Sequence, residues 1–219
     1  MAQVTKESLR YVDEVLVVDD GSTDRTVEMA TLAGAEVISH SSNLGIGSSL
    51  KTGNKYCLRN GFDIIVQLDA DGQHDPLFIS PLIDYLTRND LDLVTGSRFL
   101  GRDVENLALI RRAGIKFFST LTGLLASSRI TDITSGFRAY RSSALKLVAN
   151  IDDRHWAIGQ TFLAIRLGLK YGELPIQMHN RTNGSSQFDT MTMILYPIRM
   201  SRVMIRIACQ QSPRPDLES

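Results

Sequence analysis

The chain has 219 residues, enough for one domain with or without an appended segment. Its composition, 43% hydrophobic and 22% charged residues, is typical of a globular protein and excludes a disordered chain. The 24 basic and 24 acidic residues give a formal net charge of zero, so the charge of the whole molecule predicts no nucleic-acid binding.

The cysteines and the hydropathy give the expected compartment. Cys57 and Cys209 lie in unrelated segments and form no metal-binding or redox motif, which favours a reducing environment. The polar stretch from Met1 to Arg10 is not a signal peptide, and no run of about 18 uncharged apolar residues predicts a membrane span. We therefore expect a cytoplasmic protein.

Apolar runs alternate with helical patterns along most of the chain, which predicts a doubly wound, mostly parallel α/β sheet. The expected strands are 14–18, 35–39, 64–68, 92–97 and 173–178. The expected helices are 22–33, 46–59, 76–88, 107–127, 142–148, 158–167 and 191–209, and residues 132–140 are expected to form a turn-rich loop. We expect a main domain over residues 1–188 and a C-terminal helix and tail over 189–219.

The stretch from Ile64 to Pro76 is the most informative in the chain. Its apolar residues do not alternate with polar ones, which indicates a strand buried on both faces, and acidic residues follow at its carboxyl end. Asp69, Asp71 and Asp75 are close in sequence, and their carboxylates repel one another unless a cation lies among them. A hard divalent ion bound to a diphosphate fits such a site, whereas the alternative is a solvated acidic turn.

Basic residues gather downstream of this acidic stretch. Residues 107–150 contain seven basic residues and one acid, Asp132, so an anionic partner near the site is plausible beside the alternative of a solvated basic helix face. Two other phosphate-binding patterns are absent: Gly45-Ile46-Gly47 lacks the third glycine of a dinucleotide fingerprint, and there is no GxxxxGK[ST] sequence.

The last helical pattern is basic and amphipathic. Arg199, Arg202 and Arg206 recur on one helix face. Such a helix either lies in a membrane interface with its arginines toward anionic head groups, or docks on the domain or on a second subunit.

Six short motifs, taken together, resemble those of family 2 glycosyltransferases with the GT-A fold, on the side of dolichyl-phosphate mannose synthase and the undecaprenyl-phosphate sugar transferases. The resemblance covers roughly residues 12–188 and implies a GT-A-like, Rossmann-like sheet. The motifs are Val17 to Asp24, Asn43-Leu44-Gly45, Asp69 to His74, Gly96-Ser97-Arg98, Thr134 to Arg138, and Arg181-x-x-Gly184-x-Ser186.

The resemblance assigns roles by position. It implies that Asp19 and Asp20 lie by the nucleotide base and ribose, and that Asp69, Asp71 and Gln73 bind Mg²⁺ or Mn²⁺. It further implies that Arg181 faces the diphosphate of the nucleotide sugar. Asp69 is expected to bind the same diphosphate indirectly, through the metal ion. Three arginines are then candidates for the acceptor phosphate, and the expected catalytic residues are Asp71, Arg98 and Arg181. The acceptor-phosphate candidates are Arg98, Arg111 and Arg112.

The chain departs from the family pattern in three ways. Relatives begin with a further strand and a Pro-x-x-Asn-Glu loop, whereas only about a dozen polar residues precede Glu14, so the usual first strand is expected to be missing. Ile46 and Gln187 stand where relatives often carry Lys, and Gln160 stands where we read a family acid. The multi-pass membrane segments of some relatives are also absent.

These observations predict an enzyme, a glycosyltransferase that moves a sugar from a UDP- or GDP-linked donor to a polyprenyl phosphate or other cell-envelope glycan acceptor. The reaction is expected to be metal-assisted and inverting, at the inner face of the cell membrane, with peripheral contact through the C-terminal helix. The alternative is a truncated or degenerate homologue that binds nucleotide sugar, or a partner subunit, without turnover. A homo-oligomer is compatible with the sequence, and no nucleic acid is expected as a partner.

Overall fold

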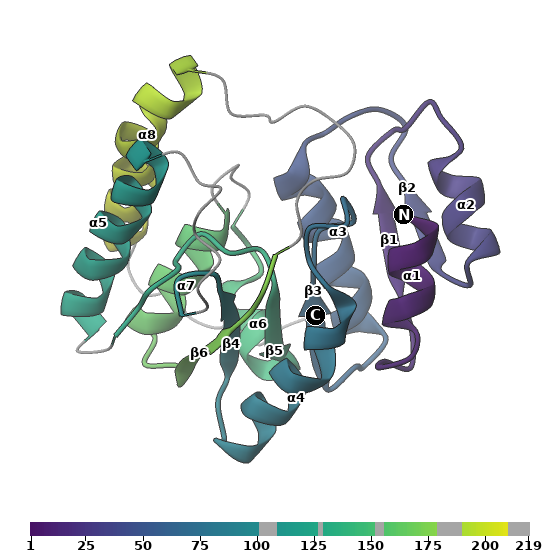
Figure 1. The fold of residues 1–219 in the computed structure, drawn as a ribbon, viewed down its shortest axis with the longest axis horizontal. Helices are drawn as coiled ribbons and strands as arrows, with labels where there is room; N and C mark the ends of the chain where they lie inside the picture. Colours follow the sequence, from purple (N-terminus) through teal and green to yellow (C-terminus); the bar gives the residue numbers. More distant parts are fainter. Residues whose placement is uncertain (101–108, 127–128, 152–155, 179–189, 210–219) are drawn as a thin grey trace.

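The computed structural model describes residues 1–100, 109–126, 129–151, 156–178 and 190–209 (Figure 1). The described strands are β1 (Leu16–Asp19), β2 (Glu36–Ser39), β3 (Ile64–Gln67), β4 (Leu93–Ser97), β5 (Arg138–Arg141) and β6 (Tyr171–Pro175). The helices before β4 are α1 (Ala2–Ser8), α2 (Thr26–Leu32), α3 (Ile46–Arg59), the 3₁₀ helix η1 (Pro76–Phe78) and α4 (Ile79–Arg88). The helices after β4 are α5 (Leu109–Ala126), α6 (Ser142–Val148), α7 (Trp156–Arg166) and α8 (Thr190–Cys209).

The strands form two sheets. β1 and β2 pair in parallel, and a second sheet has the order β3-β5-β4-β6. β5 is antiparallel to both β3 and β4, while β4 and β6 are parallel. The α/β class is therefore confirmed, and β3, β4 and β6 run in one direction with β5 reversed between them.

Two elements were absent from the sequence expectation. Residues 132–140 are expected to form a loop, yet residues 138–141 form β5 in the centre of the larger sheet. A strand of four residues with an arginine at each end is too short and too polar to show the pattern of a buried strand. The polar start of the chain contains α1, whose Thr5 and Ser8 are buried. Both elements owe their place to contacts with distant segments.

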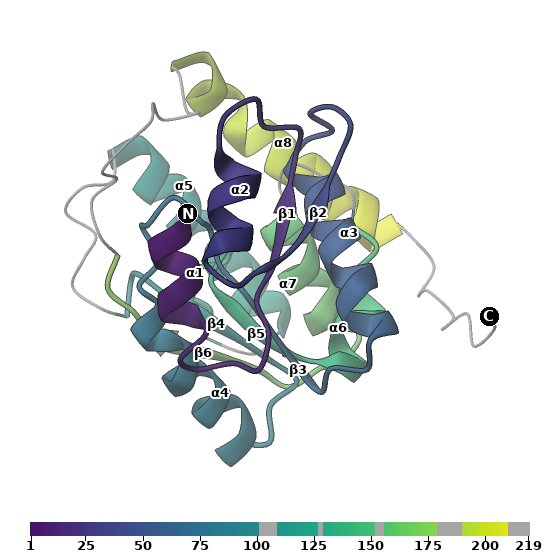
Figure 2. The same cartoon turned by 90° about the vertical axis from the view of Figure 1, so that its right-hand side faces the viewer.

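No described strand pairs with β1 on the side away from β2, or with β3 on the side away from β5. A cavity of about 1510 Å³ lies between these two strands and is lined by residues of β1, β3, α1 and α3. Figure 2 shows α1 and α3 beside the β1–β2 pair. The described strands thus form two separate sheets, with the cavity between the edge strands β1 and β3.

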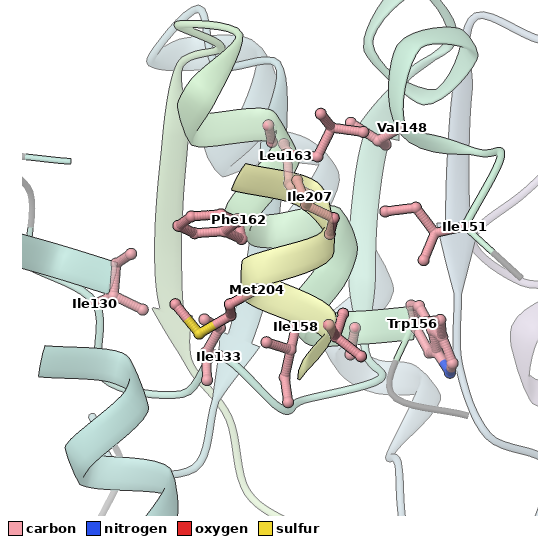
Figure 3. Close-up of a cluster of buried hydrophobic side chains, with 14 of the residues drawn as sticks. Ile130, Ile133, Val148, Ile151, Trp156, Ile158, Phe162, Leu163, Met204 and Ile207 are labelled. Atoms are coloured by element: carbon pink, nitrogen blue, oxygen red, sulfur yellow. The ribbon is translucent and has the colours of Figure 1, made fainter. Parts of the chain in front are cut away.

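The main core is formed by side chains of α5, α6, α7 and α8 with residues of β3, β4 and β5, and Figure 3 shows part of it. Met200, Val203, Met204 and Ile207 of α8 are buried in it, and the three arginines of α8 are exposed. Over residues 199–209, where the side chains of α8 are described, the helix therefore docks these four apolar residues on the domain. Among the described residues, no helix is long and apolar enough to span a bilayer.

Candidate active site

The carboxyl end of β3 leads into the acidic loop. Asp69 donates its backbone N–H to Nδ1 of His74 (2.9 Å), and Oδ1 of Asp71 accepts from the backbone N–H of Gln73 (3.0 Å). The positive φ of Gly72 (80°) allows the tight turn between them. Half of the Asp69 side chain is exposed. Asp69, Asp71 and Gln73, the residues expected to bind metal, all line the cavity.

Asp75, the third acid of this stretch, has a structural contact. Its side chain accepts from the backbone N–H of Leu77 (2.9 Å) and caps η1. Asp75 is absent from the residues that line the cavity. The acidic loop therefore presents two carboxylates to the cavity, and the third stabilises the start of a helix.

His74 supports this loop from below. It is 2% exposed, packs on Phe137 with ring centroids 5.1 Å apart, and accepts the Asp69 N–H through Nδ1. Burial lowers the pKa of His74, against the opposing effect of the Asp69 charge. The ring is therefore neutral at physiological pH, with its proton on Nε2, and its role is to position the backbone of Asp69.

Gly136 lies against the Asp69 carboxylate. A Cβ at this position would lie 3.4 Å from Oδ2 and 3.5 Å from Oδ1 of Asp69. The Thr134 to Arg138 motif thus reaches the acidic loop, and its glycine lies directly against the candidate metal ligand. This contact could not be predicted from the sequence, because Gly136 and Asp69 are far apart in the chain.

Asp19 ends β1 and Asp20 follows it, and both carboxylates accept hydrogen bonds from loop backbone. Asp19 is 5% exposed and accepts from the backbone N–H of Ser22 (3.2 Å). Asp20 accepts from the backbone N–H groups of Leu44 (2.9 Å) and Gly45 (2.7 Å).

Asp20 also pairs with a histidine. Its Oδ1 lies 2.8 Å from Nδ1 of His40, and this hydrogen bond is the largest cause of a lowered pKa for Asp20. Neither Asp19 nor Asp20 lines the cavity, although Val18 does. Their expected place beside the base and ribose therefore stays a prediction, and the structure assigns both carboxylates to the loops around β1.

Arg98 lines the cavity and forms a buried ion pair. Its Nε and Nη2 donate to the two carboxylate oxygens of Asp132 (2.6 and 2.7 Å), and Nη2 also donates to Oγ1 of Thr134 (2.7 Å). Arg98 is 7% and Asp132 0% exposed. Burial alone raises the pKa of Asp132, but the Arg98 charge and hydrogen bonds outweigh it and lower the pKa below its usual value.

Glu173 positions the backbone at Asp132, the acidic partner of this ion pair. Its carboxylate accepts from the backbone N–H groups of Thr131 and Asp132 and from the hydroxyl of Tyr171 (2.9 Å). Sequence reasoning missed Asp132, Glu173 and His74 as supporting residues. The lone acid in a basic segment was the available signal for Asp132, whereas nothing in the local sequence marked Glu173.

The other expected site residues are not brought to the cavity in the described part of the chain. Arg112 is exposed on α5, and the side chain of Arg111 lies outside the described residues, as does Arg181. Gln160 is 1% exposed and accepts the hydroxyl of Tyr140 (2.5 Å) in the core. Gln160 is not among the residues that line the cavity.

Comparison with known proteins agrees with this geometry. The model of the family "Glycosyl transferase family 2" matches residues 2–148. The polyprenol monophosphomannose synthase of Mycolicibacterium smegmatis is 35% identical over 186 residues, covering 80% of this chain and 70% of that protein. The undecaprenyl-phosphate mannosyltransferase of Micrococcus luteus is 32% identical, covering 80% and 76%.

Solved structures show the same fold. Glucosyl-3-phosphoglycerate synthase from Mycobacterium tuberculosis in complex with UDP has a TM-score of 0.66 at 23% identity, over 95% of this chain and 77% of that one. The same enzyme in complex with Mn²⁺, UDP-glucose and phosphoglyceric acid has a TM-score of 0.66 at 21% identity, over 95% and 76%. The GT-A-like α/β fold is thereby confirmed, and the chain belongs to glycosyl transferase family 2 and is a glycosyltransferase.

Proposed function

We propose that the chain transfers a sugar from a nucleotide-diphosphate sugar to a polyprenyl phosphate, with inversion, at the inner face of the membrane. The observation that carries the proposal is the pair of carboxylates, Asp69 and Asp71, lining the cavity at the carboxyl end of β3. In an open α/β sheet this edge is where ligands bind. The names of the relatives, which act on polyprenol and undecaprenyl phosphates, favour this acceptor class.

The donor groups suit a divalent ion of the Mg²⁺ or Mn²⁺ type. Such ions bind oxygen ligands through one or two carboxylates, and substrate phosphates supply further ligands. The described residues contain no cluster of three His, Cys, Asp or Glu side chains, so a complete protein cage is absent from that part of the chain. Asp69, Asp71 and the Gln73 amide would supply the protein ligands of an ion that also binds the substrate phosphates. Such an ion would stabilise the negative charge that develops on the leaving diphosphate.

A phosphate acceptor also explains how the reaction proceeds without a general base. The acceptor oxygen is already anionic near neutral pH, because the second pKa of a phosphate monoester is about 6. It attacks the anomeric carbon of the sugar, and the bond to the nucleotide diphosphate breaks. Arg98 offers hydrogen bonds from the cavity wall, but Asp132 balances its charge. We assign to Arg111, Arg112 and Arg181 the further positive charge that the acceptor phosphate and the leaving diphosphate require.

The donor site is tested by calorimetric titration of UDP- and GDP-sugars with Mn²⁺ or Mg²⁺. Asp71→Ala is expected to abolish metal-dependent binding, because it removes a ligand that lines the cavity. Asp75→Ala is the matched control: it removes a carboxylate from the same loop that caps η1 and does not line the cavity, and it should retain binding. Equal affinity of the unmodified protein with and without EDTA would count against the metal site.

A second candidate function is a homologue that binds nucleotide sugar without turnover. The two separate sheets favour it, since no strand among the described residues joins β1 to β3, and Ile46 and Gln187 stand where relatives often carry Lys. Transfer of radiolabelled sugar to a polyprenyl phosphate separates the two. Product formation supports the enzyme, whereas binding of the donor with no product across the donor, metal and acceptor panel supports the silent homologue.

We place the peripheral membrane contact on α5 and α8 together. Phe117, Leu121 and Leu124 are exposed at helical spacing on α5, and α8 presents exposed arginines. Apolar side chains inserted at the head-group level and cations beside anionic lipid are the usual elements of interfacial binding. Leu124→Glu, and separately Arg202→Glu with Arg206→Glu, should reduce co-sedimentation with anionic vesicles. Unchanged co-sedimentation of both variants removes this contact.

A further inference from the structure

The loop of residues 131–136, which we call the linking loop, contacts two parts of the candidate active site. Its Thr134 hydroxyl accepts a hydrogen bond from Nη2 of Arg98 (2.7 Å). Its Gly136 lies against the carboxylate of Asp69. The cavity is lined by all four of these residues. The position of the linking loop therefore affects how the candidate acceptor-binding arginine lies relative to the candidate metal ligand.

Two charged side chains of the sheet bind the backbone of the linking loop. The carboxylate of Glu173 accepts from the backbone N–H groups of the first two loop residues (2.8 and 3.0 Å). Arg138 donates from Nε to the carbonyl oxygen of Ser135 (2.7 Å) and from Nη2 to that of Ile133 (3.2 Å). An anion thus binds the N–H groups at the start of the loop, and a cation binds carbonyl groups further along it.

The strand register explains why both charged side chains reach the same loop. Arg138 of β5 lies opposite Thr95 of β4, and Thr95 lies opposite Glu173 of β6. Side chains of residues that are paired across neighbouring strands point to the same face of the sheet. The two charges therefore lie in one row across the sheet, with Thr95 between them, on the face that the linking loop covers.

Arg138 is buried without an acidic partner among the described residues. Its side chain is 0% exposed, and no described Asp or Glu forms an ion pair with it. The guanidinium lies 5.2 Å from the ring centroid of Trp156, which is labelled in Figure 3, and Nη1 has no hydrogen-bond partner. A buried guanidinium of this kind adds little to stability, because no ion pair offsets its desolvation. Its main polar contacts are the two carbonyl groups of the linking loop.

We propose that Arg138 is a positioning residue for sugar transfer, which acts through the linking loop on Arg98 and Asp69. Its guanidinium fixes the carbonyl groups on both sides of Thr134, so the Thr134 hydroxyl stays beside Arg98 and Gly136 stays beside Asp69. A shift of the loop by about 1 Å would misalign acceptor and donor, and such a shift can lower a rate about 100-fold. The inference rests on the proposed function for its substrates.

The kinetic test compares Arg138→Met, which keeps an unbranched side chain but removes its donors, with Arg138→Lys, which keeps a cationic donor. Transfer is measured at a temperature where circular dichroism shows each variant to be folded. Arg138→Met is expected to lower kcat about 10- to 100-fold, while the Kd of the nucleotide sugar with Mn²⁺ changes less than about threefold. Arg138→Lys should be at least about threefold faster than Arg138→Met, because its ammonium group can still donate to a loop carbonyl.

Val148→Ala is the matched control for a purely structural effect. Val148 is 0% exposed, belongs to the core that also contains Trp156, and is not among the residues that line the cavity. Its truncation should lower the Tm by leaving a cavity and should leave kcat unchanged. If Arg138→Met also leaves kcat of the folded enzyme unchanged, Arg138 is only structural and the proposal is overturned.

A second measurement needs neither donor nor acceptor. The Nε–H of Arg98 donates to Asp132 (2.6 Å), and its NMR signal reports how fast this proton exchanges with water. Arg138→Met is expected to speed this exchange at least about tenfold relative to Val148→Ala, because the loop that carries Asp132 and Thr134 is less restrained. Equal exchange in the two variants overturns the proposal. If the unmodified chain transfers no sugar, the proposed function fails, and the exchange measurement still decides whether Arg138 positions Arg98.

Discussion

Truncating Asp132 tests the buried ion pair most directly. Asp132→Ala removes the acceptor of three Arg98 hydrogen bonds, from Nε (2.6 Å), Nη2 (2.7 Å) and the backbone N–H (3.2 Å), and leaves a guanidinium that is 7% exposed. Removing one partner of a buried ion pair costs about 3–5 kcal/mol. Since whole domains are stable by about 5–15 kcal/mol, we expect a loss of about a fifth or more of the free energy of unfolding.

The assay is urea denaturation followed by circular dichroism, with Asp84→Ala as control. The Asp84 pair with Arg88 is exposed on both sides, so its removal should leave the unfolding midpoint unchanged. The double variant Arg98→Met, Asp132→Leu should recover most of the stability lost by Asp132→Ala, because it leaves no unpaired charge. A loss below about 1 kcal/mol for Asp132→Ala, as for an exposed pair, would refute the reasoning.

Three further predictions concern the core and acid stability. Gly96→Ala should cost about 1–3 kcal/mol, measured as a lowered Tm, because a Cβ there would lie 2.8 Å from Cγ2 of Ile176 in a packed interior; an unchanged Tm would contradict this contact. Tyr140→Phe should cost about 1–3 kcal/mol in chemical denaturation, since it strands the buried carbonyl oxygen of Gln160; a neutral effect would mean that water reaches it. The folded-state pKa of Asp132 lies below its usual 3.8, so its contribution to stability is present above that pH and is lost as the pH falls through the lowered value. The free energy of unfolding should therefore fall more steeply in acid for the unmodified chain than for Asp132→Asn, and parallel curves would oppose the assignment.

Local pattern predicted much of the candidate site. The unbroken apolar run of β3 followed by Asp69 and Asp71 placed both carboxylates at the carboxyl edge of a strand, where they line the cavity. Strand β5 could not be found in this way, because it has an arginine at each end and only two residues, Ala139 and Tyr140, between them. Its position comes from pairing with β3 and β4, which are distant in the chain.

The role of Arg98 shows a second limit of sequence reasoning. A basic residue after a strand suggested an anion contact, and the structure does place Arg98 in the cavity wall. It also places Asp132, 34 positions away, against Nε and Nη2 of the guanidinium. A one-dimensional charge pattern shows how many charges a segment carries, but not which of them neutralise each other.

By itself, the sequence determined the order of the strands and helices that carry the acidic loop, and the motifs that place the chain in its family. These features depend on hydrophobic runs, turn residues and helix stops that act over a few positions. Only the tertiary structure decided that α8 is covered by the core, that Asp20 holds a loop, and that β1 and β3 line a cavity between two sheets. The physical reason is that burial and strand pairing are set by segments far apart in the chain, whose relative positions no local pattern contains.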